Sequence, residues 1–243
     1  MAHFNTQLNP NKGFHPSSVT TINIPEKHHQ QCSLHLYFNL PALVFADTNE
    51  LSQRSNDYTY EYWGNIDLEK PVHALPDSRT ELLLTLPFTP YTSSTTKEPR
   101  VIEVSVPLHL RYGSPRKQIS SENSQAYERI NIDWPTPFFR CPDSTTPSET
   151  GTLTLPKHIL EVLDNSTTNG HVLIPIPPHP EAGPAQNSIS LPLGSKNDLA
   201  FVEPITAVTI LLCAFWILRV ALKTSSRLAS RNTKATNQPE KIE

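Results

Sequence analysis

The chain has 243 residues, with 24 prolines, 7 glycines and a formal net charge of −3. Proline, at about twice its usual share, disfavours a soluble bundle of long helices, because each proline removes an amide donor and clashes with the preceding turn. Neither a G-x-G-x-x-G nor a G-x-x-x-x-G-K-[ST] motif occurs, which excludes Rossmann and P-loop nucleotide sites, and the charge gives no electrostatic basis for binding nucleic acid.

The composition divides the chain into four parts. We expect a polar N-terminal segment at 1–30, whose order is left open, a β-rich domain at 31–198, a transmembrane helix at 199–222 and a basic tail at 223–243. The first thirty residues contain no apolar stretch of the length that a secretory signal peptide requires. Two topologies therefore stay open: a lumenal β domain, or a tail-anchored protein whose β domain is cytosolic.

Alternation of apolar and polar residues predicts a mainly β protein, with an antiparallel β-sandwich before the membrane helix. In the run 101–110, the even-numbered residues from Val104 to Leu110 are apolar and share one face. We expect a half-solvated strand there, with Pro107 at an edge or a bulge. Further strands are expected at residues 33–38, 58–63, 81–86, 130–134, 152–155 and 172–176.

Stretches rich in serine, threonine and proline predict exposed loops at residues 89–99, 142–150 and 177–192. One soluble helix is predicted at residues 156–163, where a proline suits the first turn and Ile159, Leu160 and Leu163 form an apolar stripe. Most of the proline excess thus falls in turns and loops.

The segment at 204–222 is predicted to span a membrane. Its 19 residues include one charge, Arg219, and at ~1.5 Å per residue they form a helix of ~28 Å, close to the hydrocarbon thickness of a bilayer. Arg219 lies near the end, where its side chain can reach the interface. Basic residues follow the segment and acidic residues precede it, so the tail is expected in the cytosol and the β domain in the lumen.

Two further features favour the lumen. Asn165 begins the sequon Asn165-Ser166-Thr167, a candidate N-glycosylation site. The β domain carries two cysteines, Cys32 and Cys141, which are either joined in a disulfide or buried as thiols. Cys213 lies inside the expected span and is interpreted as a small apolar residue.

The residues that catalysis or metal binding would need are dispersed. The ten histidines form no HExxH pair, and the adjacent His28 and His29 cannot easily direct both rings at one ion from a strand. There is no CxxC motif, no G-x-S-x-G elbow and no close pair of carboxylates. We therefore expect a protein that is not an enzyme and uses neither a metal nor a cofactor.

Four strings stand out from this background. They are residues 40–47 (LPALVFAD) with Glu50 and Leu51, 106–115 (VPLHLRYGSP), 135–142 (PTPFFRCP), and 191–194 (LPLG) with Val202 and Thr206. In this order they resemble the PIG-X family, the small non-catalytic subunits of GPI mannosyltransferase I. The second string is similar to the most distinctive signature of that family, and we call it the signature string.

The resemblance implies a type I membrane protein of the endoplasmic reticulum, in contact with membrane lipids, that binds and stabilises a multi-spanning catalytic subunit of PIG-M type. That enzyme transfers the first mannose of the GPI anchor from dolichol-phosphate-mannose on the lumenal face. One span cannot enclose such a membrane-embedded site, so the lack of a catalytic motif agrees with a subunit role. The alternatives are a lumenal chaperone-like factor or enzyme, and a tail-anchored cytosolic adaptor.

Within the signature string, the candidate partner contacts are Pro107, His109, Arg111, Tyr112 and Pro115. Alternation places the odd-numbered residues opposite the apolar face of the strand. Two roles stay open for the string: part of the partner interface, or a packing motif from core to edge in which a buried Arg111 satisfies loop carbonyls.

Overall fold

The computed structural model describes residues 1–25, 32–65, 79–87, 100–115, 127–142, 153–164 and 171–236, with side chains as far as residue 229. It is mainly β, with antiparallel strand pairs and one long apolar helix near the C-terminus, which confirms the predicted fold class. The strands and two short helices form one compact unit, the β domain, and the long helix belongs to a second unit.

The strands of the β domain are β1 (His3–Asn9), β2 (Ser17–Ile24), β3 (Ser33–Leu40), β4 (Val44–Phe45), β5 (Thr59–Trp63), β6 (Thr80–Leu86), β7 (Arg100–Pro107), β8 (His109–Leu110), β9 (Tyr127–Asp133), β10 (Thr136–Pro142), β11 (His171–Pro175) and β12 (Gln186–Pro192). The helices are α1 (Thr48–Ser52), α2 (Lys157–Asp164) and, in the second unit, α3 (Leu199–Thr236). Among the described residues, the sheets have the orders β1-β2-β7, β11-β10-β3-β6-β5, β12-β9 and β4-β8.

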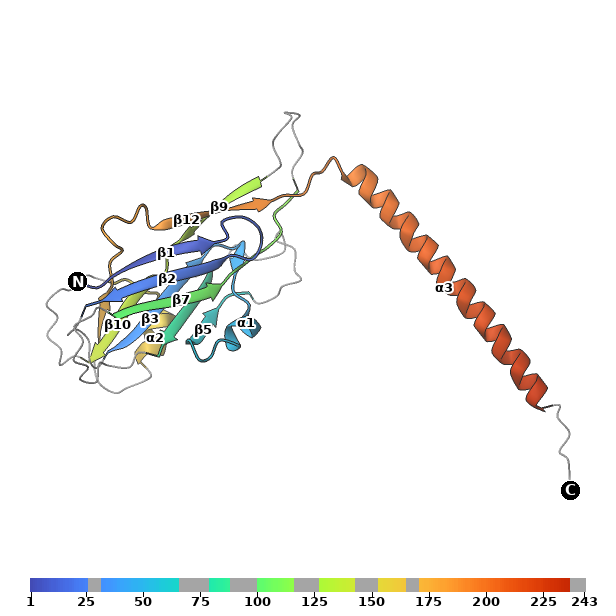
Figure 1. The fold of residues 1–243 in the computed structure, drawn as a ribbon, viewed down its shortest axis with the longest axis horizontal. Helices are drawn as coiled ribbons and strands as arrows, with labels where there is room; N and C mark the ends of the chain where they lie inside the picture. The colour runs from blue at the N-terminus through green and yellow to red at the C-terminus, as the bar shows by residue number, and fades with distance from the viewer. Residues whose placement is uncertain are drawn as a thin grey trace, which may run out of the picture. The chain divides into compact units, whose positions relative to one another are not determined.

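The main core lies between the β1-β2-β7 sheet and the five-stranded sheet, which are stacked (Figure 1). Ile22 and Val104 enter this core from the first sheet, and Leu36 enters it from β3 of the second. On the other face of the five-stranded sheet, Tyr37 packs in a smaller core with Ile159 of α2. Strand β3 is therefore covered on both faces, which explains why six of its eight residues are buried.

The N-terminal residues supply two strands of the β domain. β1 pairs antiparallel with β2, and β2 pairs with β7 over its whole length. Part of their inward face is polar, since Thr6 and Thr20 are buried and their hydroxyls lie 3.0 Å apart in a hydrogen bond. This arrangement differs from the expected separate segment at residues 1–30, because polar groups that satisfy one another can be buried in a core.

The signature string begins on an edge strand, as expected. β7 is at the edge of its sheet within the described chain, and it ends at Pro107, which is buried. Val104, Val106, Leu108 and Leu110 are all buried, so the predicted apolar face of the run is confirmed. The run is divided into β7 and β8 rather than forming one strand.

Other sequence predictions differ from the structure in detail. Residues 153–155 of the strand expected at 152–155 form no strand, and Leu155 instead packs against α2. The loop expected at 177–192 contains β12. The loop expected at 89–99 and residues 143–150 of another lie outside the described residues.

Helix α3 carries the candidate membrane span. Its segment Leu199–Ala229 has a mean hydropathy of 2.3 over the most apolar window, and none of that window is buried. The helix begins at the predicted residue 199 but continues past 222 to Thr236. The hydroxyls of Thr209 and Ser226 donate to carbonyls one turn earlier, at 2.8 and 2.9 Å, so they need no partner in a lipid environment.

Candidate functional site

The signature string forms a short strand that is held on both sides. β8 pairs antiparallel with β4, which sets His109 opposite Phe45. On the other side, the amides of Leu108 and Leu110 donate to carbonyls of the segment 14–16, both at 2.8 Å. Because the backbone is paired in both directions, the side chains of the string are held in defined directions.

Arg111 is buried beneath the string, with 7% of its surface exposed. Its Nη2 donates to the carbonyl of Asn65 at 3.1 Å, and its Cζ lies 4.6 Å from the centroid of the Phe45 ring. Its amide donates to the carbonyl of Leu43 at 2.9 Å. A buried guanidinium needs such partners to offset the loss of hydration, and these contacts match the packing alternative for Arg111.

His109 connects three segments of the chain. Its Nε2 lies 2.8 Å from a carboxylate oxygen of Glu50 in α1, and its Nδ1 lies 2.9 Å from Nδ1 of His15. Its ring also stacks on Phe45, with the centroids 5.4 Å apart. In the neutral state, His109 satisfies both contacts when it donates from Nε2 to Glu50 and accepts at Nδ1 from His15.

Tyr112 faces solvent next to these buried residues. Its side chain is 79% exposed, and its ring lies tilted against Phe14 at 4.7 Å between centroids. Pro115 is also exposed, whereas Pro107 is buried and His109 is intermediate. Of the five candidate contacts, Tyr112 therefore presents the largest free apolar surface to a partner.

At Gly113, the string 191–194 lies against the signature string. A Cβ at this position would lie 2.5 Å from Cδ2 of Leu193 and 3.0 Å from a carboxylate oxygen of Glu128. A larger residue here would have to displace the ends of these two side chains, so the lack of a side chain at Gly113 lets Leu193, which belongs to the string 191–194, pack closely. Three of the four family-like strings thus lie together, and the fourth, 135–142, supplies β10.

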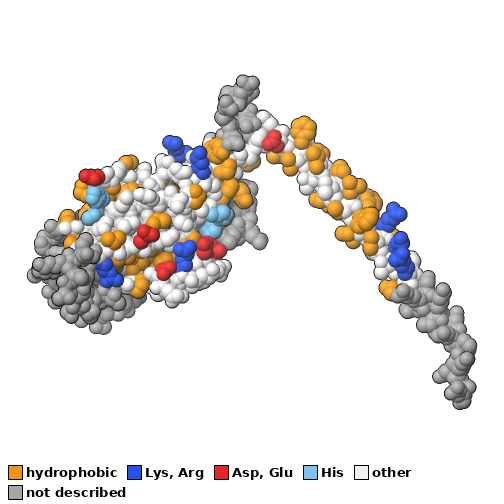
Figure 2. Space-filling view, in the orientation of Figure 1, with side chains coloured by type: hydrophobic (Ala, Val, Ile, Leu, Met, Phe, Trp, Pro, Cys, Tyr) orange, Lys and Arg blue, Asp and Glu red, His pale blue; other side chains and the backbone are white. Residues whose placement is uncertain are grey.

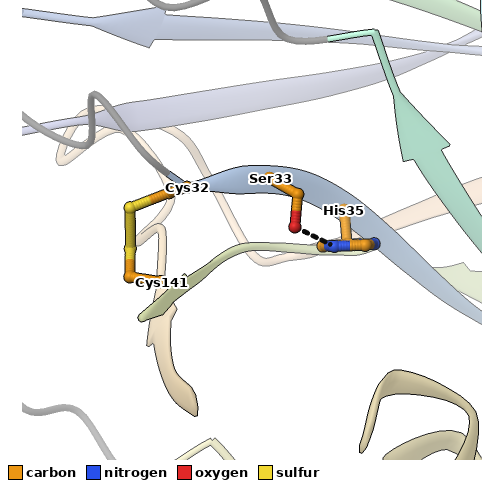
Figure 3. The surroundings of a disulfide bond; sticks show 4 residues. All are labelled: Cys32, Ser33, His35 and Cys141. Carbon is orange, nitrogen blue, oxygen red and sulfur yellow. Dashed lines mark hydrogen bonds between the residues drawn. A yellow bond between two sulfur atoms is a disulfide. The ribbon is translucent and has the colours of Figure 1, made fainter. Parts of the chain in front are cut away.

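A disulfide joins Cys32 to Cys141 (Figure 3). Cys32 directly precedes β3 and Cys141 lies in β10, the strand that pairs with β3. The sequence left open whether these cysteines were bonded or were thiols, and the structure has the bonded state. Cys213 is a free cysteine in α3.

His35 is a buried titratable group beside the disulfide. Hydroxyls of Ser33 and Thr85 lie 2.7 and 3.0 Å from its two ring nitrogens, and its ring stacks on Phe138 (Figure 3 shows the Ser33 bond). Burial lowers the pKa of His35 to about 4, and the positive charge of Arg140 acts in the same direction. The imidazole is therefore neutral at physiological pH.

Three residues that the sequence singled out, Asn165, His28 and His29, lie outside the described residues. Within the ranges that the structure describes, no group of three or more His, Cys, Asp or Glu side chains is placed to hold a metal ion. The sequence did not indicate that His15 contacts the signature string, whereas the first family-like string already pointed to Phe45 and Glu50.

Comparison with known proteins places this chain in a family. It is similar to protein pbn1 of Neurospora crassa, with 29% identity over 219 residues that cover 85% of this chain and 40% of that protein. It is also similar to pbn1 of Schizosaccharomyces pombe, with 27% identity over 144 residues (57% and 40%), and to pbn1 of Aspergillus fumigatus, with 29% over 147 residues (53% and 27%).

The chain thus spans two fifths or less of the length of these relatives. No solved structure matches it. The family model described as PIG-X / PBN1 matches residues 11–222, which take in most of the β domain, all four family-like strings and the apolar part of α3 up to residue 222. On this match, the chain belongs to the PIG-X / PBN1 family.

Proposed function

We propose that this chain acts in GPI-anchor biosynthesis as the non-catalytic subunit of GPI mannosyltransferase I, and that it stabilises a multi-spanning catalytic subunit of PIG-M type. The observation that carries the proposal is the family match over residues 11–222, which includes most of the β domain and the apolar part of α3 up to residue 222. The four family-like strings support the finer assignment, because the small members of this family are subunits of that transferase.

The proposed location is the endoplasmic reticulum membrane, with the β domain in the lumen and the tail in the cytosol. The disulfide between Cys32 and Cys141 supports a lumenal β domain, because disulfides persist in oxidising compartments. The charges flanking the apolar part of α3 support the same orientation, since Lys223 and Arg227 follow that part and Glu203 precedes it.

Within the β domain, we assign different roles to neighbouring residues of the signature string. Arg111 and His109 fix the string to β4 and α1 through Phe45 and Glu50. Tyr112 is then the contact offered to the partner, because it is exposed and directly follows Leu110 and Arg111, whose amides are hydrogen-bonded to other segments. Tyrosine is enriched at the energetically dominant positions of interfaces.

Depletion of the chain tests the subunit role. We expect the abundance of the multi-spanning transferase to fall on immunoblots, and the transfer of mannose from dolichol-phosphate-mannose in microsomes to fall with it. Re-expression of the chain should restore both, and the transferase should co-purify with the detergent-solubilised chain. Normal abundance and normal activity after depletion would reject the proposal in favour of a chaperone-like factor, an enzyme or an adaptor.

Asn165 and protease protection test the topology. If the β domain is lumenal, glycosidase treatment should increase the mobility of the chain on gels, and Asn165→Gln should abolish that shift. The β domain should also resist protease in sealed microsomes and become sensitive when detergent is added. A β domain that is digested in sealed microsomes would identify a cytosolic adaptor instead.

A further inference from the structure

An open cleft of about 480 Å³ lies at one end of the outer face of the β1-β2 pair. The register places His3 opposite Asn23 and Asn5 opposite Thr21, and these four side chains form the floor. The wall is the turn at residues 179–182. This cleft is separate from the signature string, whose contacts to the N-terminal segment are at residues 14–16.

The wall of the cleft is fixed to the edge of β1. The amide of Phe4 donates to the carbonyl of Pro177 at 3.1 Å, and the amide of His179 donates back to the carbonyl of Phe4 at 2.8 Å. The turn is closed by a bond from the amide of Ala182 to the carbonyl of His179, also at 2.8 Å. The cleft is therefore preformed, and this edge of β1 is already occupied, so an added peptide strand has no ladder to join there.

The side chains of the cleft have hydrogen-bonding capacity that the protein does not use. Within the described part of the chain, the side chains of Asn5, Thr21, Asn23 and Glu181 make no hydrogen bonds or ion pairs with other residues. The amide of Glu181 donates to Nδ1 of His179 at 3.2 Å, which leaves the proton of the neutral ring on Nε2 as a donor. The cleft thus presents both donors and acceptors of hydrogen bonds.

The charges of the side chains that line the cleft indicate which classes of ligand it can bind. Among the residues that the structure describes, the lining includes one carboxylate, Glu181, and no lysine or arginine, so these residues offer no fixed cation to a phosphate or sulfate group. In Figure 2, histidine and acidic atoms adjoin at this end of the β domain, beside uncharged surface. An acyl chain seated here would cover the carboxamides of Asn5 and Asn23 and leave them without hydrogen-bond partners, which disfavours a lipid tail.

A ligand that fits this lining is neutral and carries many groups that both donate and accept hydrogen bonds. Sugar hydroxyls have this property, and carboxamides, carboxylates and imidazoles provide complementary partners for them. The rings of His3 and His179, whose centroids are 4.7 Å apart, add flat surfaces on which a pyranose ring can rest. We propose that the cleft between the β1-β2 face and the turn at 179–182 binds an uncharged carbohydrate.

The same chemistry has two sources, the glycan of a glycoprotein and the head group of a glycolipid. The test uses the full chain in detergent on an array that carries neutral N-glycans, neutral oligosaccharides cut from glycolipids, and sialylated or phosphorylated versions of each. We expect retention on neutral structures and weaker retention on the charged versions. Retention on the first set alone identifies a glycoprotein source, and retention on the second set identifies a glycolipid source.

Matched variants connect the binding to the cleft. The double variant Asn5→Ala/Asn23→Ala removes two carboxamides and should weaken binding by about tenfold or more. Gln7→Ala, on the same outer face of β1 but outside the cleft, should bind as the unaltered chain does. Absence of binding to every neutral structure at millimolar concentration, or equal binding by the double variant with an unchanged melting temperature, would overturn the proposal. Transferase abundance in cells carrying the double variant is a separate readout, so the proposed function is tested independently.

Discussion

The guanidinium of Arg111 lies over the ring of Phe45, with Cζ 4.6 Å from the ring centroid. The two residues belong to different family-like strings, and the same ring also stacks on His109. Phe45 thus joins the odd-numbered side chains of the signature string to β4. Substitutions at Arg111 and at Tyr112 should therefore have different consequences, although the two residues are adjacent in sequence.

Arg111→Ala is expected to lower the free energy of unfolding by about 2 kcal/mol, because it removes the contact with Phe45 and the hydrogen bond to the carbonyl of Asn65. Arg111→Lys should be intermediate, since an ammonium keeps the charge but not the planar group. Chemical unfolding of the purified chain measures both changes. An Arg111→Ala chain as stable as the original would show that Arg111 has no packing role.

Tyr112→Ala is expected to leave the stability within about 0.5 kcal/mol of the original, because the side chain is 79% exposed. It should nevertheless reduce the amount of catalytic subunit that co-purifies with the chain. Tyr127→Ala is the matched control, since Tyr127 is another exposed tyrosine, in β9. Equal recovery of the catalytic subunit with all three chains would remove Tyr112 from the interface.

Loss of the Cys32 to Cys141 bond is expected to destabilise the β domain by about 4 to 5 kcal/mol, because the bond closes a loop with a sequence separation of 109 and so restricts the unfolded chain. Cys141→Ser and treatment with a reductant should lower the melting temperature, and the oxidised chain should migrate faster on non-reducing gels. Cys213→Ser should change neither property, since Cys213 is a free cysteine in α3. A melting temperature that does not respond to reductant would contradict this expectation.

Acidification is expected to destabilise the β domain through His35. Its pKa is about 4 when folded and 6.5 when unfolded, so the unfolded chain binds more protons between these values. The contribution is complete above about pH 6.5 and is lost as the pH falls toward 4, by about 3 kcal/mol. Unfolding measured against pH should show a shallower decline for His35→Gln, and identical slopes for the two chains would reject this role of His35.

Much of the fold could be predicted from periodicity alone. β3, β5 and β6 coincide with predicted strands because their inward residues are apolar and alternate, and α2 was recognised from Ile159 and Leu163. The apolar composition of α3 was sufficient to identify the candidate span. In the strands and in α2 most buried side chains are hydrophobic, so the apolar residues of the sequence indicate which positions are buried.

The strands that periodicity misses have polar residues at buried positions or a proline inside a sheet. β1 and β2 bury Thr6, Ser18 and Thr20. Because serine and threonine are also common in exposed loops, their presence at inward positions hides the pattern of a strand. β10 contains Pro137 although it lies inside its sheet, where proline is normally disfavoured.

The contact between His15 and His109 joins residues 94 positions apart, which no local pattern can indicate.

The position of β3 in its sheet also affects how the protein can fold during synthesis. Both of its hydrogen-bonded neighbours, β6 and β10, come later in the chain, and so does the cysteine that bonds to Cys32. At about 5 to 20 residues per second, the ribosome needs roughly 5 to 20 s to advance from β3 to the end of β10. Until β10 is complete, β3 lacks one of its two paired neighbours and the disulfide partner of Cys32, so nascent chains that stop before β10 should be the form of this protein most dependent on chaperones.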